Sequence, residues 1–208
     1  WEKVWKKTWH FVMKASELDQ AGAFYTHELG KESFLFVRGS DDEIRGFYNV
    51  CRHRGNRLCQ VEEGVVDTFT CPYHGWKWND DGSLKQVADP HFFKQFDEGI
   101  PEDELGLVPI KVDVWEGWLW FNMDSESCPL REYLGPIGEH LETYHFEDCT
   151  VLEYQTFEWN ANWKHAWDAF NESYHFAELH PNMVNIGEGH DVPIELCGIH
   201  SRMLNFNR

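Results

Sequence analysis

Two pairs of cysteine and histidine constrain this chain more than any other feature of its sequence. The first pair is Cys51 and His53, and the second is Cys71 and His74, with residues 54–70 between the pairs. An apolar run of β type precedes each pair, so each pair is predicted to lie in a loop directly after a strand. Two such loops placed face to face would bring two thiols and two imidazoles together.

This donor set favours one kind of metal centre. In a Rieske-type 2Fe-2S cluster, two thiolates bind one iron and two imidazoles bind the other. Neutral imidazoles reduce the negative charge on the cluster, so its reduction potential should exceed that of an all-cysteine site. Gly55 and Gly75 follow the two pairs directly. Because glycine permits tight turns, both loops are predicted to bring backbone amides close to sulfur.

Two alternatives remain open from the residues alone. Zinc could bind the same four side chains, although common zinc fingers pair Cys with Cys and His with His. The thiols could also be buried packing groups beside unrelated histidines. The other cysteines lack paired metal spacing and are interpreted as packing residues: Cys59, Cys128, Cys149 and Cys197. The chain shows no export signal, so we expect metal binding in a reducing cytoplasm rather than disulfide bonds.

Composition bounds the partners that the chain can have. Hydrophobic residues make up 42% and aromatic residues 16% of the sequence, which predicts packed cores rather than disorder. The formal net charge of −18 argues against nucleic acid, because phosphate binding needs clustered Lys and Arg. No stretch approaches the roughly 18 apolar residues of a membrane-spanning helix. We therefore expect a small molecule and other proteins as partners, with no nucleic acid and no membrane.

The pattern along the chain predicts an α+β fold in two parts. Short β-type runs fill the first part, and residues 87–108, rich in Pro, Gly and acids, predict a surface excursion. We expect an all-β domain of antiparallel sheets with two cluster-binding loops over residues 1–125, including an N-terminal lead-in. Residues 126–208 are expected to begin an α+β domain that is incomplete here. The strands and helices expected are a short helix before a strand around 9–13, strands at 34–38, 44–50, 65–70, 76–78, 108–114, 119–122 and 150–159, helical spacing over 129–146, a helix over 163–179 and a strand from 199 onward.

The segment before Pro181 predicts a second metal site. Non-haem Fe(II) oxygenases hold iron with two histidines and one carboxylate, and His175 and His180 are the candidate imidazoles. Positions five apart lie about 140° apart around an ideal helix, so the helix must bend or end between them. Pro181 disfavours the α region for His180. Glu172 is on the face of His175 in a helix and would orient that imidazole. The alternative is a surface helix with scattered histidines and acids.

Both segments resemble the Rieske non-haem iron oxygenases of the aromatic-ring-hydroxylating type, in the N-terminal half of the large (alpha) oxygenase subunit. The resemblance is carried by Cys51-Arg52-His53-Arg54-Gly55, by Cys71-Pro72-Tyr73-His74-Gly75-Trp76 and by the run from Asn162-Trp163-Lys164 through Glu172 and His175 to His180. It implies that Cys51, His53, Cys71 and His74 hold the 2Fe-2S cluster and that His175 and His180 bind a mononuclear Fe(II). Glu172 then occupies the position of the carboxylate that carries electrons between subunits. Ala169 departs from the Asn frequent in the family, and the third iron ligand is expected downstream of residue 208.

The resemblance also implies a function. It predicts the terminal oxygenase component of a multicomponent system that takes electrons from NAD(P)H through a reductase, a ferredoxin or both. With these electrons the enzyme would activate O₂ and hydroxylate a small organic substrate, expected to be aromatic, by mono- or dioxygenation. The assembly is expected to be a homotrimer or an alpha-beta hetero-hexamer. The rival interpretation is a Rieske electron-transfer protein without a catalytic iron.

Overall fold

The computed structural model describes residues 1–96, 99–180 and 192–203. The chain divides into two compact units, Trp1–Leu130 and Arg131–Arg208. The fold is of the predicted α+β class, with antiparallel sheets and few helices. The predicted domain boundary after residue 125 stays a prediction. Among the helices in the described ranges, none has the length and apolar character needed to cross a membrane.

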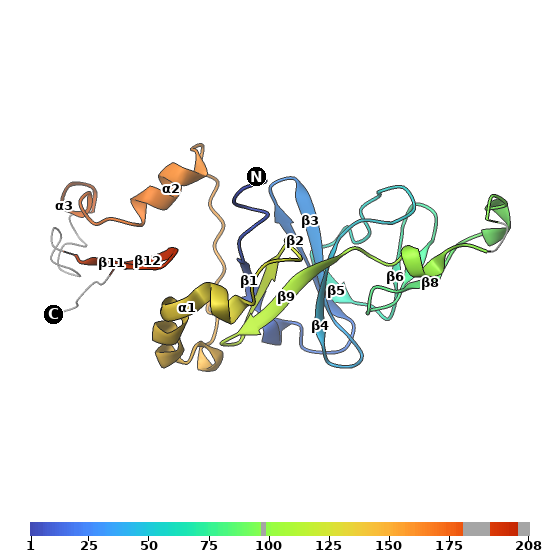
Figure 1. Ribbon diagram of the computed structural model, residues 1–208, viewed down its shortest axis with the longest axis horizontal. Coiled ribbons are helices and arrows are strands. Elements are labelled where there is room, and N and C mark those ends of the chain that lie inside the picture. Colours follow the sequence, from blue (N-terminus) through green and yellow to red (C-terminus); the bar gives the residue numbers. More distant parts are fainter. Residues whose placement is uncertain (97–98, 181–191, 204–208) are drawn as a thin grey trace. The chain divides into compact units, whose positions relative to one another are not determined.

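A seven-stranded antiparallel sheet forms most of the first unit (Figure 1). Its strands follow one another in the order β1-β10-β9-β4-β3-β2-β5. Their bounds are β1 His10–Lys14, β2 Ala23–Leu29, β3 Glu32–Arg38, β4 Ile44–Tyr48, β5 Glu63–Val65, β9 Pro109–Trp115 and β10 Trp118–Asn122. The predicted hairpin of β3 and β4 is confirmed, as are the strands β9 and β10.

Strand β3 carries core residues on both faces of this sheet. Phe34 and Phe36 belong to one buried cluster, and Leu35 and Val37 belong to another. Successive side chains of a strand point to opposite faces, so four consecutive apolar residues supply both cores. The core on the Leu35 face also contains the two loop thiols, Cys51 and Cys71, the loop tryptophan Trp76, and Trp78 directly after the second loop. Both loops are therefore anchored to the core through their cysteines.

A small three-stranded sheet holds the second Cys-His loop. Its strands are β6 Phe69–Thr70, β7 Lys77–Trp78 and β8 Leu84–Gln86, and the loop runs from β6 to β7. The single strand predicted over 65–70 is instead split between β5 and β6. The excursion that follows β8 contains the 3₁₀ helices η2 Pro90–Phe92 and η3 Glu102–Glu104. Val87 and Leu107 at its ends are buried, so the excursion is only partly at the surface.

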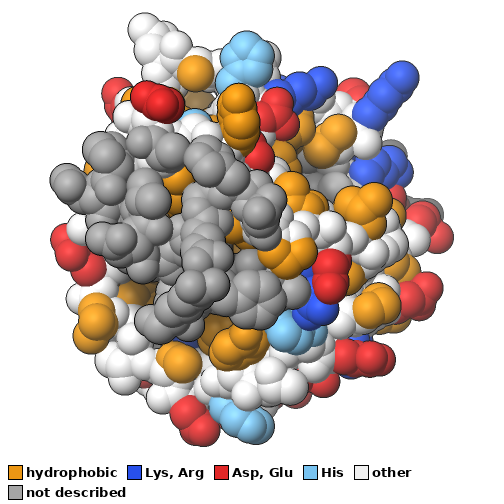
Figure 2. Space-filling model, turned by 90° about the vertical axis from the view of Figure 1, so that its left-hand side faces the viewer, with side chains coloured by type: hydrophobic (Ala, Val, Ile, Leu, Met, Phe, Trp, Pro, Cys, Tyr) orange, Lys and Arg blue, Asp and Glu red, His pale blue; other side chains and the backbone are white. Residues whose placement is uncertain are grey.

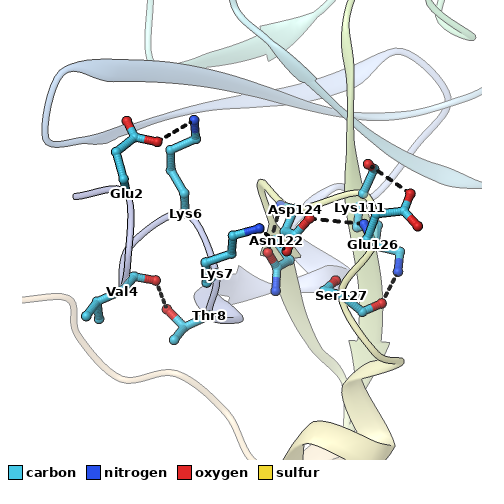
Figure 3. Close-up of polar contacts among 11 residues, drawn as sticks. Glu2, Val4, Lys6, Lys7, Thr8, Lys111, Asn122, Asp124, Glu126 and Ser127 are labelled. Carbon is cyan, nitrogen blue, oxygen red and sulfur yellow. Dashed lines mark hydrogen bonds and ion pairs between the residues drawn. The ribbon is translucent and has the colours of Figure 1, made fainter.

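The N-terminal residues are linked to the segment that follows β10. Lys7 Nζ lies 2.7 Å from a carboxylate oxygen of Asp124, and Lys111 Nζ donates to the carbonyl of Ser127 (Figure 3). Trp9 Nε1 donates to the carbonyl of Cys128 at 3.1 Å. Residues 2–7 form hydrogen-bonded turns rather than the predicted short helix, and the 3₁₀ helix η1 Ala15–Glu17 follows β1.

The second unit contains short helices and one hairpin. They are α1 Leu130–Leu141, η4 Glu142–Tyr144, η5 Phe146–Asp148, α2 Trp163–Ala169, α3 Phe176–Leu179, β11 Ile194–Cys197 and β12 His200–Met203. The strand predicted over 150–159 is wrong, because this stretch pairs with no strand in the described part of the chain. The continuous helix predicted over 163–179 is also wrong, since it is interrupted after Ala169. The predicted strand from residue 199 is confirmed over His200–Met203.

Candidate metal centres

The two Cys-His loops share one backbone conformation. In each loop the cysteine carbonyl accepts from the glycine four residues later, and the cysteine N–H donates to the carbonyl five residues later. The bonds are Gly55 to Cys51 at 3.0 Å, Cys51 to Asn56 at 2.8 Å, Gly75 to Cys71 at 2.9 Å and Cys71 to Trp76 at 2.8 Å. Gly55 and Gly75 have φ of 73° and 72°, a region in which glycine pays no steric cost. The tight turns predicted at these glycines are confirmed.

The loops bring the four predicted cluster ligands together as two like pairs. Cys51 and Cys71 are 3% and 2% exposed, and both lie in the same buried cluster. The ring centroids of His53 and His74 are 4.8 Å apart, at an interplanar angle of 68°. His74 is exposed and His53 half-buried. The thiol pair therefore lies inside and the imidazole pair outside, which fits a cluster with two thiolates on one iron and two imidazoles on the other.

The polar surroundings of these donors suit metal binding. Burial raises the pKa of the Cys51 thiol, and backbone N–H groups of His53 and Arg54 oppose this shift by donating to its sulfur. The same N–H groups would stabilise a metal-bound thiolate. Partial burial lowers the pKa of His53, and the nearby His74 lowers it further, which favours the neutral imidazole that binds metals. In the described ranges no three His, Cys, Asp or Glu side chains converge on one ion.

An aromatic surrounding of His53 was not predicted from the sequence. The Trp76 indole stacks on the His53 ring at 4.7 Å between centroids and an interplanar angle of 6°. Phe93, from the segment after η2, meets the same imidazole edge-on at 5.9 Å. Phe93 lies in the stretch that the sequence predicts to be a surface excursion, where its apolar aromatic side chain was the one sign of a buried contact.

The candidate iron ligands of the second unit flank helix α3. His175 precedes the helix as its N-cap and His180 follows it as its C-cap. Their ring centroids are 5.4 Å apart at an interplanar angle of 71°, so the two imidazoles are neighbours. His180 has φ −125° and ψ 55°, and its predicted departure from the helix is confirmed. Pro181, to which that departure was attributed, lies outside the described residues.

Glu172 contacts His175 although no helix joins them. One carboxylate oxygen is hydrogen-bonded to Nδ1 of His175, and the other accepts from the backbone N–H groups of Tyr174 and His175. The hydrogen bond to His175 lowers the pKa of Glu172, so the carboxylate is ionised. With Nδ1 occupied, Nε2 of His175 is the nitrogen left for a metal.

Two protein-family matches cover the segments that contain the two candidate metal sites. Residues 8–97 match the Rieske [2Fe-2S] domain, and residues 146–206 match the ring hydroxylating alpha subunit catalytic domain. The chain belongs to the Rieske oxygenase alpha subunits, and these two domains imply a Rieske cluster and a mononuclear iron.

Individual relatives include oxygenase subunits of two monooxygenases. The chain is 35% identical to the carnitine monooxygenase oxygenase subunit of Escherichia coli K12, over 86% of this chain and 48% of that protein. It is 32% identical to the glycine betaine monooxygenase oxygenase subunit of Pseudomonas aeruginosa UCBPP-PA14, over 88% of this chain and 42% of that protein. The chain thus spans about half the length of these relatives.

Solved structures show the same relationship. A quaternary ammonium Rieske monooxygenase superposes with a TM-score of 0.89 at 29% identity, covering 100% of this chain and 57% of the other. A naphthalene 1,2-dioxygenase superposes with a TM-score of 0.74 at 31% identity, covering 87% of this chain and 41% of the other.

Proposed function

We propose that the intact protein is the terminal oxygenase of a multicomponent Rieske system. The observation that carries this proposal is the presence of two distinct donor sets in one chain. In the first unit the two loops supply a buried thiol pair and an imidazole pair. In the second unit two neighbouring imidazoles flank helix α3, and one of them is hydrogen-bonded to a carboxylate. An electron carrier would need only the first set, so the second favours an oxygenase over the rival interpretation.

Each donor has a defined task in this proposal. Cys51 and Cys71 hold the inner iron of the cluster, and His53 and His74 hold the outer iron on the exposed side. His175 and His180 would bind the Fe(II). When bound, the two centres supply electron storage and O₂ activation. Glu172 fixes the orientation of His175 and offers an ionised carboxylate through which electrons pass from a neighbouring subunit, in a trimer or an alpha-beta hetero-hexamer.

The relatives favour a different substrate class from the aromatic one expected from the sequence. An aromatic compound was expected, yet relatives named for carnitine and glycine betaine favour a small quaternary ammonium compound. Biphenyl and naphthalene dioxygenases are also relatives, so the assay must include both classes. With a reductase, NADH and O₂, we expect substrate-dependent O₂ uptake with carnitine or glycine betaine and none with naphthalene. The reverse pattern would restore the aromatic assignment.

Iron analysis of the intact protein separates the oxygenase from the electron carrier. The oxygenase contains three irons per chain, two in the cluster and one at His175 and His180, whereas the carrier contains two. His175→Ala should lose one iron and all turnover while keeping the visible spectrum of the cluster. His140→Ala, in α1, serves as the control and should keep all three irons. Simultaneous loss of the cluster in His175→Ala would contradict the assignment of two separate sites.

The role of Glu172 is tested by an alanine substitution. Glu172→Ala should retain the metals but lose electron transfer to the iron, because the carboxylate beside His175 is removed. Glu178→Ala, an exposed position on α3, is the matched control and should transfer electrons normally. The measurement is single-turnover oxidation of the chemically reduced protein. Normal oxidation of Glu172→Ala would count against the bridging role.

A further inference from the structure

The His53 ring is enclosed by two aromatic side chains that touch each other. Trp76 stacks on the imidazole at 4.7 Å, and Phe93 meets it edge-on at 5.9 Å. Phe93 also meets the Trp76 indole edge-on, at 5.7 Å and 72°. Stacked and edge-to-face rings at these distances attract one another beyond their apolar contact. We call Trp76 and Phe93 the aromatic brace.

The brace is anchored in the protein core. Trp76 is 4% exposed and lies 6.3 Å from the fully buried Trp78, whose Nε1 donates to the Leu105 carbonyl at 2.9 Å. Phe93 packs against the same core cluster, and its backbone N–H donates to the Pro90 carbonyl at 3.0 Å. Residues from two separate segments, the second Cys-His loop and the excursion after β8, thus hold one imidazole.

The second imidazole lacks such an enclosure. His74 is exposed, and its nearest ring partner is Tyr73 at 3.9 Å, itself 59% exposed. Metal-binding histidines are commonly oriented by a hydrogen bond to their second ring nitrogen. Within the described part of the chain, the His53 ring makes ring contacts but no side-chain hydrogen bond. Its orientation therefore depends on packing.

We propose that Trp76 and Phe93 are positioning residues that fix the orientation of the His53 imidazole for the outer iron of the cluster. This inference rests on the proposed function, because it assigns His53 to the cluster. Phe93 is the informative member, since it contacts the ligand ring from outside the ligand loops and is only partly buried. Truncating it removes two ring contacts without opening the centre of the core.

The test compares Phe93→Ala, Phe93→Leu and Phe93→Tyr in the intact, cluster-loaded protein. Phe92→Ala is the matched control, because Phe92 is 72% exposed and its ring meets only His91 among the described residues. Pulsed EPR of the reduced cluster measures the ¹⁴N couplings of its two histidines, and bleaching of the visible spectrum under chelator measures cluster loss. For Phe93→Ala we expect a broadened coupling for one histidine and bleaching about two- to tenfold faster, the range that corresponds to lost aromatic pairs.

The conservative variants separate positioning from simple packing. Phe93→Tyr keeps the ring and should restore the parent couplings, whereas Phe93→Leu fills the space without a ring and should not. Parent-like couplings in Phe93→Ala, or full restoration by Phe93→Leu, would overturn the inference. A parent protein with no Rieske EPR signal would instead contradict the proposed function, and the brace with it.

Discussion

At the scale of single residues, backbone hydrogen bonds to the sulfur distinguish Cys51 from Cys59, a third cysteine that packs against the same core. Burial raises the pKa of Cys59 to about 12, from an ordinary value of 9.0, while Cys51 has backbone N–H groups donating to its sulfur. Because only the thiolate reacts and binds metal, Cys59 is expected to be inert. The distinction agrees with the interpretation of Cys59 as a packing residue.

Alkylation tests this assignment of Cys59. At pH 8 the shift lowers the thiolate fraction by about 10³, so iodoacetamide should modify the exposed Cys149 much faster than Cys59, as measured by mass spectrometry. Because folding raises this pKa, the protonated thiol contributes to the free energy of unfolding. That contribution is fully present below pH 9 and is lost as the pH rises toward 12. Equal labelling rates for the two cysteines in the folded protein would contradict the prediction.

Two half-buried histidines predict a loss of stability in acid. The rings of His10 and His27 both contact Phe121, at 5.2 Å and 5.9 Å between centroids, and burial lowers both pKa values below 6.5. Below that pH the unfolded chain binds more protons than the folded one, so the free energy of unfolding should fall as the pH drops below 6.5 toward the lowered folded-state pKa values. His27→Gln should flatten the Tm profile, and His91→Gln, an exposed control, should not. An unchanged slope in His27→Gln would be evidence against this origin.

At the scale of elements, two glycine turns with the same positive φ should tolerate alanine differently. Gly55 (φ 73°) has open space where a Cβ would be added, whereas a Cβ on Gly82 (φ 82°) would lie 2.3 Å from the Phe47 ring. The backbone alone should cost Gly55→Ala about 1–2 kcal/mol. Gly82→Ala must also displace a core ring and should cost more. Chemical denaturation of both variants measures the difference, and equal losses would show that the clash is relieved at no cost.

The sequence predicted those elements whose signals are local. Strands β3, β4, β9 and β10 have apolar runs bounded by turn residues, and the pairing confirmed them. The strand expected over 150–159 has the same residue character but pairs with no described strand. The break after α2 depends on side chains: Asn171 donates to the Trp167 carbonyl, and Glu172 accepts backbone N–H groups that a continuous helix would use. Helix propensity does not reveal that these side chains compete with the helix for backbone hydrogen bonds.

For the candidate metal centres too, the sequence predicted the features that have local signals. Cys-His spacing and the glycines after each pair carry the cluster site in the sequence, and the loops have the expected turns. The pairing of thiol with thiol and imidazole with imidazole was expected from the Rieske ligand set, whereas the aromatic surroundings of His53 required the three-dimensional fold. Phe93 could not be assigned, because its contact with His53 joins segments that are distant in sequence and has no motif.

At the scale of the whole molecule, the two units differ in how much core they contain. Both large buried clusters consist of residues between Val12 and Phe121. Among the described residues beyond Leu130, only Leu134 and Ile137 are buried hydrophobics. Figure 2 shows hydrophobic side chains at the surface among acidic ones. In the second unit the exposed large hydrophobics are Tyr144, Leu152, Tyr154, Phe157, Trp159, Trp163, Trp167, Phe170, Tyr174, Leu179, Ile194, Leu196 and Ile199.

This difference predicts how the two units behave when separated. Residues 1–130, expressed alone, should unfold cooperatively and take up the 2Fe-2S cluster, because the core and all four candidate ligands lie within them. Residues 131–208, expressed alone, should bind a hydrophobic dye and show no cooperative transition, because burial of apolar side chains supplies most of the driving force for folding. Circular dichroism and EPR of the two fragments provide the measurement. A cooperative transition in the 131–208 fragment would show that its stability does not depend on a core of this kind.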